Sequence, residues 1–265
     1  MKDIFSIEGK VALVTGGSRG IGEMIAAGFL AHGAKVYISS RKADVCDATA
    51  KRLADQYAGD CISVPADVSN LEGVEQLVEQ IQGHERQLHI LVNNAGAAWA
   101  APIEEFPEKG WDKVMDTNVK GIFFLTQRLL PLLRSSATHE DPARVINVGS
   151  VDGLTTPRFD NFSYGASKSA VHHLTRILAA HLVKDHIIVN AIAPGPFPTW
   201  MLSGAVGFEG EIEGVDWDSI GANNPRGRVG TMEDIAGVAI FLSSRAGAYT
   251  VGETITCDGG GVVCG

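Results

Sequence analysis

Short apolar runs alternate with longer amphipathic segments along almost the whole chain. The apolar runs cover residues 10–15, 35–39, 61–65, 89–93, 144–148, 187–192 and 253–257. Segments with a helical spacing of apolar residues lie between them, at 20–32, 42–57, 70–83, 107–134, 162–184 and 231–243. Seven strands that alternate with six helices predict an α/β fold, a doubly wound sheet of mostly parallel strands with helices on both faces.

Several predicted strands are apolar throughout, without the alternation of a half-exposed strand. Ile90-Leu-Val92 and Val145-Ile146 are examples. Continuous apolar strands are expected in a parallel sheet that is covered on both faces. Such sheets bind ligands at the carboxyl ends of their strands, where the strand order reverses. We therefore expect functional residues to follow directly after strands.

No linker interrupts the alternation, so residues 1–265 are predicted to form a single domain. The irregular stretch is 194–230, which is rich in Gly and Pro and contains Phe197, Trp200, Met201, Phe208 and Trp217. This segment is interpreted either as a lid over an apolar substrate or as an insertion that packs on the surface. Pro131 should kink or end the fourth helical segment.

Composition narrows the class of protein without indicating a reaction. Of 265 residues, 45% are hydrophobic and 20% are charged, as in ordinary globular domains. The formal net charge of -9 argues against a nucleic-acid-binding surface. The amino-terminal residues lack an apolar signal core, and no stretch approaches about 18 uninterrupted apolar residues. We expect a cytoplasmic protein that does not span a membrane.

The cysteines do not indicate a metal site. They stand at positions 46, 61, 257 and 264, with no C-x-x-C pair and no His neighbour at ligand spacing. Reduced thiols are expected, and neither a zinc site nor a dithiol motif is predicted.

The turn after the first predicted strand is rich in glycine. Thr15 is followed by Gly16-Gly-Ser-Arg19-Gly20-Ile21-Gly22 and then by an amphipathic segment. Glycines let a backbone turn tightly and approach a pyrophosphate held at the positive end of a helix. Between the first strand and the first helix of an alternating chain, this pattern predicts a dinucleotide site.

A second group of residues is suited to moving a proton to or from a carbonyl oxygen. Tyr164 and Lys168 lie four residues apart and would share one face of a helix, and Ser150 lies fourteen residues before Tyr164. A nearby ammonium favours the phenolate, so we expect Lys168 to lower the pKa of Tyr164. The pair alone is also compatible with an ordinary surface contact.

Together these motifs resemble those of the short-chain dehydrogenase/reductase family, almost from end to end of the chain. That family has a single-domain, Rossmann-type fold, and the resemblance implies a nicotinamide-dependent oxidoreductase acting on a carbonyl or a secondary alcohol. Further family motifs fall on Asp67-Val68, Asn93-Asn94-Ala95-Gly96, Asn118, Pro194-Gly195 and Thr199. The expected cofactor contacts are Gly16, Ser18, Arg19, Gly20, Ile21, Gly22, Ser40, Arg41, Asp67, Val68, Asn94, Ala95, Gly96, Tyr164, Lys168, Pro194, Gly195 and Thr199.

The resemblance also implies a role for each catalytic residue. Tyr164 gives a proton to the carbonyl oxygen while hydride passes from the nicotinamide, and Ser150 orients that oxygen. Lys168 holds the nicotinamide ribose, and Asn118 lies on a water path that resupplies protons. A simple cap at Ser150 and support of a backbone kink by Asn118 are the structural alternatives. The fourteen-residue spacing exceeds the family's usual value of about thirteen, which indicates one extra residue within 151–162.

The end of the second predicted strand indicates which dinucleotide is bound. Ser40 stands where an acidic side chain would accept hydrogen bonds from the adenosine ribose. A carboxylate there would repel a 2′-phosphate, whereas Arg41 and Arg19 offer two guanidinium groups for it. The sequence therefore predicts NADP(H), unless both arginines are merely solvated.

Three residues are candidates for substrate contact. Asp152 either hydrogen-bonds a substrate hydroxyl or amine or faces solvent in a turn, and Trp99 either lines the pocket or packs in the core. Trp200 belongs to the predicted lid. The histidines on the helix that carries Tyr164 are assigned to an interface or the surface rather than to catalysis. They are His172, His173 and His181.

Within the family the chain most resembles bacterial NADP-dependent β-ketoacyl reductases, and among these the branch associated with rhamnolipid formation. The supporting stretches are 11–22, 129–134, 142–147 and 246–249. A 3-oxoacyl thioester substrate would need basic residues for the carrier's phosphate, which Arg226 and Arg228 could supply, but segment 203–218 is strongly acidic. A steroid, a sugar alcohol or a xenobiotic ketone remains an alternative substrate.

A non-catalytic dinucleotide sensor is the rival from a different class. It would keep the glycine turn and lose the catalytic group, whose four positions are all filled here. The carboxyl-terminal segment 252–260 resembles the one through which family members associate, which implies a homotetramer or a homodimer.

Overall fold

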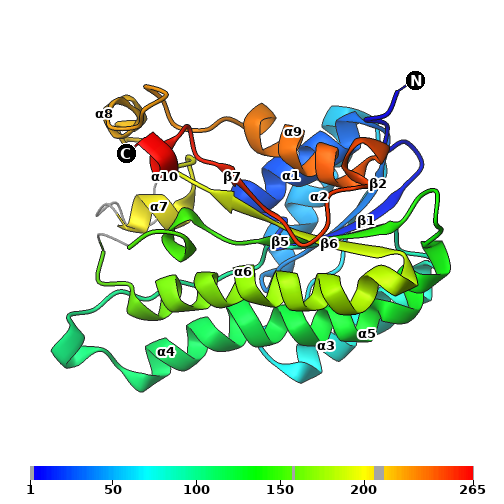
Figure 1. Cartoon of the computed structure of the whole chain (residues 1–265), viewed down its shortest axis with the longest axis horizontal. Helices are drawn as coiled ribbons and strands as arrows, with labels where there is room; N and C mark the ends of the chain where they lie inside the picture. Colours follow the sequence, from blue (N-terminus) through cyan, green and yellow to red (C-terminus); the bar gives the residue numbers. More distant parts are fainter. Residues whose placement is uncertain (1–2, 157–158, 206–211, 265) are drawn as a thin grey trace.

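A computed structural model describes residues 3–156, 159–205 and 212–264 (Figure 1). Its sheet has seven strands in the order β3-β2-β1-β4-β5-β6-β7, and every neighbouring pair is parallel. The strands are β1 Val11–Thr15, β2 Lys35–Ser39, β3 Cys61–Ser63, β4 Ile90–Asn93, β5 Ala143–Val148, β6 Ile187–Pro194 and β7 Thr254–Cys257. The prediction of a doubly wound α/β sheet is confirmed, and the described sheet is parallel throughout.

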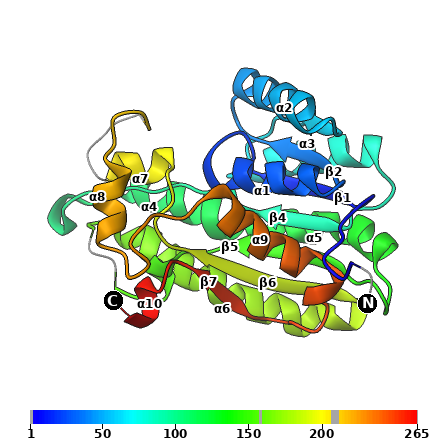
Figure 2. The ribbon, with the colours of Figure 1, turned by 90° about the horizontal axis from the view of Figure 1, so that it is seen from above.

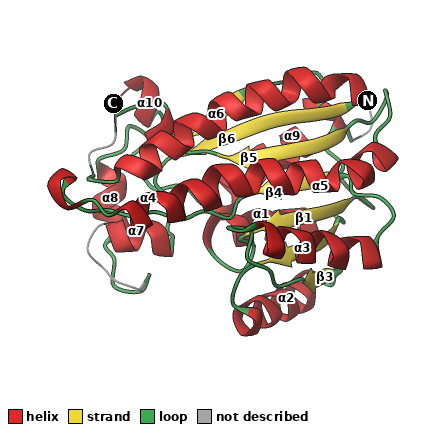
Figure 3. Ribbon diagram, turned by 90° about the horizontal axis from the view of Figure 1, so that it is seen from below, coloured by secondary structure: helices red, strands yellow, loops and turns green. Residues whose placement is uncertain are grey.

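Long helices cover both faces of the sheet. One face carries α1 Gly20–Ala31, α2 Ala43–Tyr57 and α9 Met232–Ser243 (Figure 2). The other carries α3 Leu71–His84, α4 Glu108–Met115, α5 Gly121–Ser136 and α6 Phe162–Leu182 (Figure 3). The sequence did not predict three short helices, α7 Trp200–Ala205, α8 Trp217–Ala222 and α10 Gly261–Cys264. They gather at the end of the sheet toward which β5 and β6 point.

The apolar strands divide their side chains between two cores. In β1, Ala12 and Val14 pack with α1 and α9, whereas Leu13 packs with α3 and α5. Successive side chains of a strand point to opposite faces, so a strand covered on both sides is apolar at most of its positions. The continuous apolar runs of the sequence therefore report a sheet between two helical layers.

The segment predicted as one helix at 107–134 is divided. α4 ends at Met115, a π-helical turn follows at Asp116–Lys120, and α5 continues to Ser136. Of the two outcomes predicted for Pro131, an end of the helix is wrong, because α5 continues through it, and a kink stays a prediction. Pro131 has no N–H, so the carbonyl of Gln127, four residues earlier, lacks its helical hydrogen bond. Both residues lie on the exposed side of α5, where water can donate to that carbonyl instead.

The segment 194–230 is partly helical, with α7 and α8 inside it. Its aromatic side chains do not act as one group. Phe197 is buried, and a Cβ at Gly230 would overlap its ring, so Phe197 belongs to the core. Trp200 and Met201 are exposed, whereas Phe208 lies outside the described residues. A lid over the substrate stays a prediction for α7.

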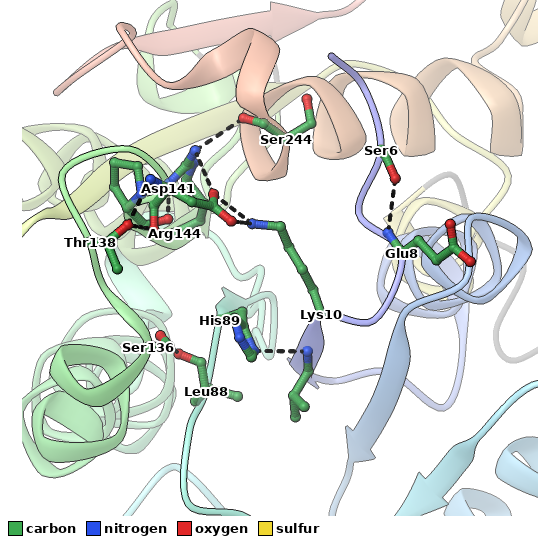
Figure 4. A network of polar contacts seen from close by, with 12 residues as sticks. Ser6, Glu8, Lys10, Leu88, His89, Ser136, Thr138, Asp141, Arg144 and Ser244 are labelled. Atoms are coloured by element: carbon green, nitrogen blue, oxygen red, sulfur yellow. Dashed lines mark hydrogen bonds and ion pairs between the residues drawn. The ribbon is translucent and has the colours of Figure 1, made fainter. Parts of the chain in front are cut away.

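Polar side chains tie the strands together at the amino-terminal edge of the sheet (Figure 4). Arg144, at the start of β5, is 1% exposed and donates to the carbonyls of Pro142 and Ser244. Asp141 lies 3.7 Å from the same guanidinium and 2.7 Å from the ammonium of Lys10. A buried cation needs such partners to offset the loss of hydration. The candidate site lies at the opposite edge of the sheet, where the strands have their carboxyl ends.

Within the described part of the chain, no helix is both long and apolar enough to cross a membrane. The same residues hold no cluster of three or more His, Cys, Asp or Glu side chains suited to a metal ion, and all four cysteines are free.

Candidate active site

The strand order reverses between β1 and β4, and a polar clamp joins these strands at their carboxyl ends. Thr15, the last residue of β1, accepts through Oγ1 from the main-chain N–H groups of Asn94 and Ala95, at 3.0 Å each. The Asn94 side chain donates back to the carbonyls of Thr15 and Gly16, at 2.9 and 3.2 Å. The predicted glycine turn and the Asn-Asn-Ala-Gly segment are thus one structural unit.

The glycine turn needs its glycines for two different reasons. Gly16 and Gly20 have φ of 64° and 58°, a conformation that costs other residues energy. At Gly22, a Cβ would overlap the Asn94 amide and the Gly16 carbonyl. The turn leads into the first residues of α1, whose free N–H groups form an anion site. This geometry fits the pyrophosphate of a dinucleotide.

Arg41 faces a groove beside the end of β2. The groove is lined by Arg41, Ser69, Glu108, Lys109, Asp112, Lys113, Asp116 and Thr117. It runs between the ends of β2 and β3 and the helix α4, next to the predicted Asp67-Val68 site. Asp67 already accepts from the N–H of Ser69 at 3.0 Å, so part of this carboxylate is used in a local turn.

The start of segment 194–230 packs against the glycine turn. β6 ends at Pro194, and Gly195 donates to the Cys257 carbonyl at 3.0 Å. A Cβ at Gly20 would lie 3.3 Å from Thr199. The Arg19 guanidinium lies 5.8 Å from the ring centroid of Trp200, a cation–π contact. Thr199 and Trp200 thus lie beside the glycine turn, and cofactor contact by Thr199 and substrate contact by Trp200 stay predictions.

Ser150, Tyr164 and Lys168 meet beyond the end of β5. The Ser150 side chain lies close enough to the Tyr164 phenol to lower its pKa. The Lys168 ammonium donates to the Val148 carbonyl at 2.7 Å and lies 5.4 Å from the Tyr164 ring centroid. A Cβ at Gly96 would lie 3.8 Å from the same ammonium, so the group also adjoins the Asn94–Gly96 segment. The helical i and i+4 spacing of α6 produces this meeting.

The predicted effect of Lys168 on Tyr164 is wrong for the protein alone. The tyrosine side chain is half-buried, and desolvation raises the pKa of Tyr164 to about 12. Ser150 opposes the rise, whereas Asp152 adds to it. Burial also lowers the pKa of Lys168 to about 8, and its ammonium is directed at a carbonyl rather than at the phenol. Desolvation therefore outweighs the attraction of the neighbouring charge.

Asn118 lies fully buried in the π-helical turn. Its amide nitrogen donates to the Ala97 carbonyl and to the Ser167 hydroxyl, at 2.9 Å each, and its amide oxygen accepts from the Ala97 N–H at 2.8 Å. Ser167 in turn donates to the Tyr164 carbonyl at 2.8 Å. The Asn118 side chain therefore joins the loop after β4 to α6, and its amide hydrogens are both used.

Asp152 lies close enough to Tyr164 and Lys168 to affect their pKa values electrostatically. Its main-chain N–H donates to the Ser150 hydroxyl at 3.1 Å, and its carboxylate accepts from the Asn161 amide at 3.1 Å. The same carboxylate raises the pKa of Tyr164 and opposes the lowering at Lys168. Asp152 is half-exposed, which leaves it open to a ligand.

Trp99 is half-buried beside α4. A Cβ at Gly110 would lie 2.7 Å from its indole, and the Lys113 ammonium lies 5.3 Å from its ring centroid. These contacts account for the packing alternative, and substrate contact by Trp99 stays a prediction.

The assignment of His172 to an interface or the surface is wrong. Its side chain is 2% exposed, and Nε2 accepts from the Ser150 N–H at 3.4 Å. Burial, together with the charge of Lys168, lowers the pKa of His172 to about 4. His173 and His181 are exposed on the same helix, as the sequence analysis expected for surface residues. The signal for His172 was its place four residues after Lys168, on the catalytic face of α6.

His172 should make the protein less stable in acid. A histidine that is held neutral stabilises the fold above its unfolded pKa of 6.5, and this contribution is lost as the pH falls toward the folded pKa of about 4. We expect about 2–3 kcal/mol less stability at pH 4.5 than at pH 7 from this residue. Urea unfolding of the wild type and of His172→Gln at both pH values measures it. Equal losses in the two proteins would contradict the prediction.

Arg226 and Arg228, the basic residues suggested for a carrier's phosphate, differ in their surroundings. The Arg228 guanidinium holds Asp234 with two contacts of 2.6 and 3.0 Å, and this pairing holds the pKa of Asp234 well below its usual range. Asp234 also accepts from Thr231 at the start of α9. Arg226 is exposed. Of the two arginines, Arg228 is therefore already paired within the chain.

Comparisons with known proteins identify a family and relatives of this chain. The model of a family described as Enoyl-(Acyl carrier protein) reductase matches residues 16–261. A rhamnolipids biosynthesis 3-oxoacyl-(acyl-carrier-protein) reductase from Pseudomonas aeruginosa is 48% identical over 98% of this chain and 99% of its own length. A gluconate 5-dehydrogenase from Gluconobacter oxydans is 36% identical over 97% of this chain and 96% of its own. The solved Pseudomonas aeruginosa RhlG/NADP active-site complex superposes with a TM-score of 0.91 at 47% identity, covering 99% of this chain and 100% of that one.

Proposed function

The chain belongs to the short-chain dehydrogenase/reductase family, and from this premise we propose that it transfers hydride between NADP(H) and the carbonyl or secondary alcohol of a small molecule. One observation carries the proposal. The side chains of Ser150, Tyr164 and Lys168 meet at the carboxyl end of the sheet, beside the clamp that joins the glycine turn to β4. A binding protein without chemistry would not need this group.

The residues around the glycine turn fit NADP(H). The positive-φ glycines and the start of α1 suit a pyrophosphate, and the turn after β2 has no carboxylate next to Ser40 that would repel a 2′-phosphate. Arg41 and Arg19 are exposed beside this site, and a guanidinium can bind an anion through paired N–H groups. The RhlG structure contains NADP, which supports the same choice for this chain.

In reduction, the bound nicotinamide supplies a hydride to the carbonyl carbon. Tyr164 donates its proton to the carbonyl oxygen, and its raised pKa keeps that proton in place at neutral pH. Ser150 donates a hydrogen bond to the same oxygen and thereby orients it. Lys168 would hold the nicotinamide ribose, and its ammonium presents a positive charge beside Tyr164. Because both hydrogens of the Asn118 amide are used, a role in proton supply would fall to its main chain.

A 3-oxoacyl thioester is the first candidate substrate, because the Pseudomonas relative is named as a reductase of one. The second candidate is a ketone with a hydroxyl group near its carbonyl, such as a keto sugar acid. The half-exposed Asp152 carboxylate beside the catalytic group, and a relative named gluconate 5-dehydrogenase, favour this alternative. Because Arg228 is paired with Asp234, it is not available to bind the phosphate of the carrier that would deliver a 3-oxoacyl thioester.

Asp152→Ala should separate these two kinds of substrate. Loss of a charged acceptor for a substrate hydroxyl lowers kcat/KM about 10- to 100-fold for a hydroxyketone such as acetoin. For butan-2-one, which has no such hydroxyl, we expect a change of less than about twofold. Steady-state kinetics on this pair measures both values. A similar fall for both ketones would show that Asp152 acts on Ser150 or Tyr164 instead.

NADPH oxidation, followed by absorbance against 3-oxoacyl thioesters, hydroxyketones, steroids and simple ketones, tests the proposed function. Turnover of at least one class that depends on Tyr164 is expected. If no carbonyl or alcohol reacted with either dinucleotide, a dinucleotide sensor without chemistry would become the better account.

We further infer a homotetramer or homodimer located in the cytoplasm. Exposed apolar side chains support association, at Phe123 on α5, Ile177 on α6, and Tyr249 and Val251 before β7. Light scattering of the purified protein measures the number of subunits.

A further inference from the structure

The two catalytic hydroxyl groups stand on different elements of the fold. Ser150 begins a turn after β5, whereas Tyr164 lies in the first turn of α6. Hydrogen bonding of both groups to one carbonyl oxygen requires their separation to be fixed within a fraction of an ångström. We call residues 149–153 the serine turn. Residues that attach the serine turn to α6 therefore influence the reaction.

The sheet does not supply a partner for the Ser150 N–H. β5 pairs with β4 as far as Asn147 and with β6 as far as Val148, and the next N–H, that of Gly149, donates to Ile192 at 2.7 Å. Ser150 continues the extended backbone, and its N–H points at His172 Nε2, 3.4 Å away. Without this acceptor, a buried main-chain donor would remain unpaired.

The contact between the Ser150 N–H and His172 Nε2 is long for a hydrogen bond, but close packing of the two segments supports it. A Cβ at Gly149 would overlap the His172 ring, so strand and imidazole touch directly. At the other end of the serine turn, a Cβ at Gly153 would lie 2.6 Å from the main chain of Lys168. The Ser169 hydroxyl also donates to the Gly153 carbonyl at 2.9 Å. The serine turn is thus held against α6 at both of its ends.

His172 occupies the position on α6 that this attachment requires. Tyr164, Lys168 and His172 follow one another at intervals of four residues and share one face of the helix. The His172 ring is buried, and Nδ1 faces the main chain of Gly153 without a formed hydrogen bond. A neutral ring with its proton on Nδ1 leaves Nε2 free to accept from Ser150.

We propose that His172 is a positioning residue for the reaction, which holds the main chain of Gly149 and Ser150 against α6 and so fixes the Ser150 hydroxyl relative to that of Tyr164. The inference rests on the proposed function, because it takes Ser150 and Tyr164 as the groups that contact the carbonyl oxygen.

Three substitutions at His172 and one control test the proposal with the full-length enzyme, NADPH and its best carbonyl substrate. Leu removes the acceptor at similar size, Gln keeps an oxygen near the position of Nε2, and Asn is too short to reach Ser150. His173→Leu, on the exposed side of α6, is the matched control. The measurements are kcat, KM, the NADPH dissociation constant from nucleotide fluorescence, and the melting temperature.

We expect kcat to fall about 10- to 100-fold in the Leu and Asn variants and less than about fivefold in the Gln variant. The NADPH dissociation constant should change less than about twofold, as should every value for the control. A kcat within about twofold of wild type in the Leu and Asn variants would overturn the proposal. Equal losses in the Gln and Leu variants would also overturn it, because Gln restores the acceptor.

If the Leu variant does not fold, the comparison of the Gln and Asn variants still tests whether kcat depends on an acceptor for the Ser150 N–H. Both side chains are amides, and they differ only in length. Failure of this inference is distinct from failure of the proposed function. If no carbonyl or alcohol reacted with the wild-type enzyme, the proposed function would be wrong, whereas a fully active Tyr164→Phe variant would reject only the role of Tyr164 as proton donor. If Tyr164→Phe were inactive while all His172 variants kept wild-type kcat, only the positioning role would be wrong.

Discussion

Tyr164→Phe should lower kcat by about a thousandfold and leave NADPH binding nearly unchanged. The substitution removes a single hydroxyl, the proton donor to the carbonyl oxygen, from a side chain that keeps its packing. Ser150 and Lys168 still surround the substrate, but neither replaces the phenol. The Lys168 ammonium is directed at the Val148 carbonyl rather than at the phenol, and Ser150 is a far weaker acid.

Initial rates of NADPH oxidation at saturating substrate measure the loss, and nucleotide fluorescence measures cofactor binding. Tyr249→Phe is the matched control, because it removes one hydroxyl from a fully exposed tyrosine and should keep wild-type kcat. Near-full activity of the Tyr164 variant would falsify the assignment of Tyr164 as the proton donor. A loss of cofactor binding in parallel with kcat would instead indicate that the phenol supports the nucleotide.

The fold was predictable because its sequence signals are local and repeated. Leu13 packs in one core and its neighbours Ala12 and Val14 in the other, so a strand buried on both faces is apolar at most of its positions. The glycine turn was predictable for a similar reason. Gly16 requires a positive φ, and Gly22 leaves no space for a side chain beside Asn94, so few other residues are possible there.

Properties that depend on three-dimensional surroundings were not predictable in the same way. The spacing of Tyr164 and Lys168 revealed that they share a helix face, but it did not reveal that desolvation dominates the pKa of each. His172 was assigned to the surface, because the sequence does not show that the serine turn covers this part of α6. The passage of α5 through Pro131 likewise depends on which side of the helix faces water.

Replacement of Ser40 by Asp together with Arg41 by Ala should change the preference for NADPH over NADH by about a thousandfold in kcat/KM. The carboxylate repels a 2′-phosphate and accepts hydrogen bonds from the free ribose hydroxyls of NADH. The second substitution removes a guanidinium that is exposed beside the phosphate site. Arg41→Ala alone should account for about 10- to 100-fold of the change.

Kinetics with both nucleotides at a fixed carbonyl concentration give the two kcat/KM values. Arg52→Ala removes the same charge from an exposed arginine on the neighbouring helix α2, where it pairs with Glu23 at 2.7 Å, and should leave the preference unaltered. An unchanged preference in Arg41→Ala would reject its role in phosphate recognition. In that case Arg19 would be the remaining candidate. Its contact with Trp200 makes a further outcome measurable, because a phosphate that draws Arg19 away from the indole should change the Trp200 fluorescence when NADP(H), but not NAD(H), binds.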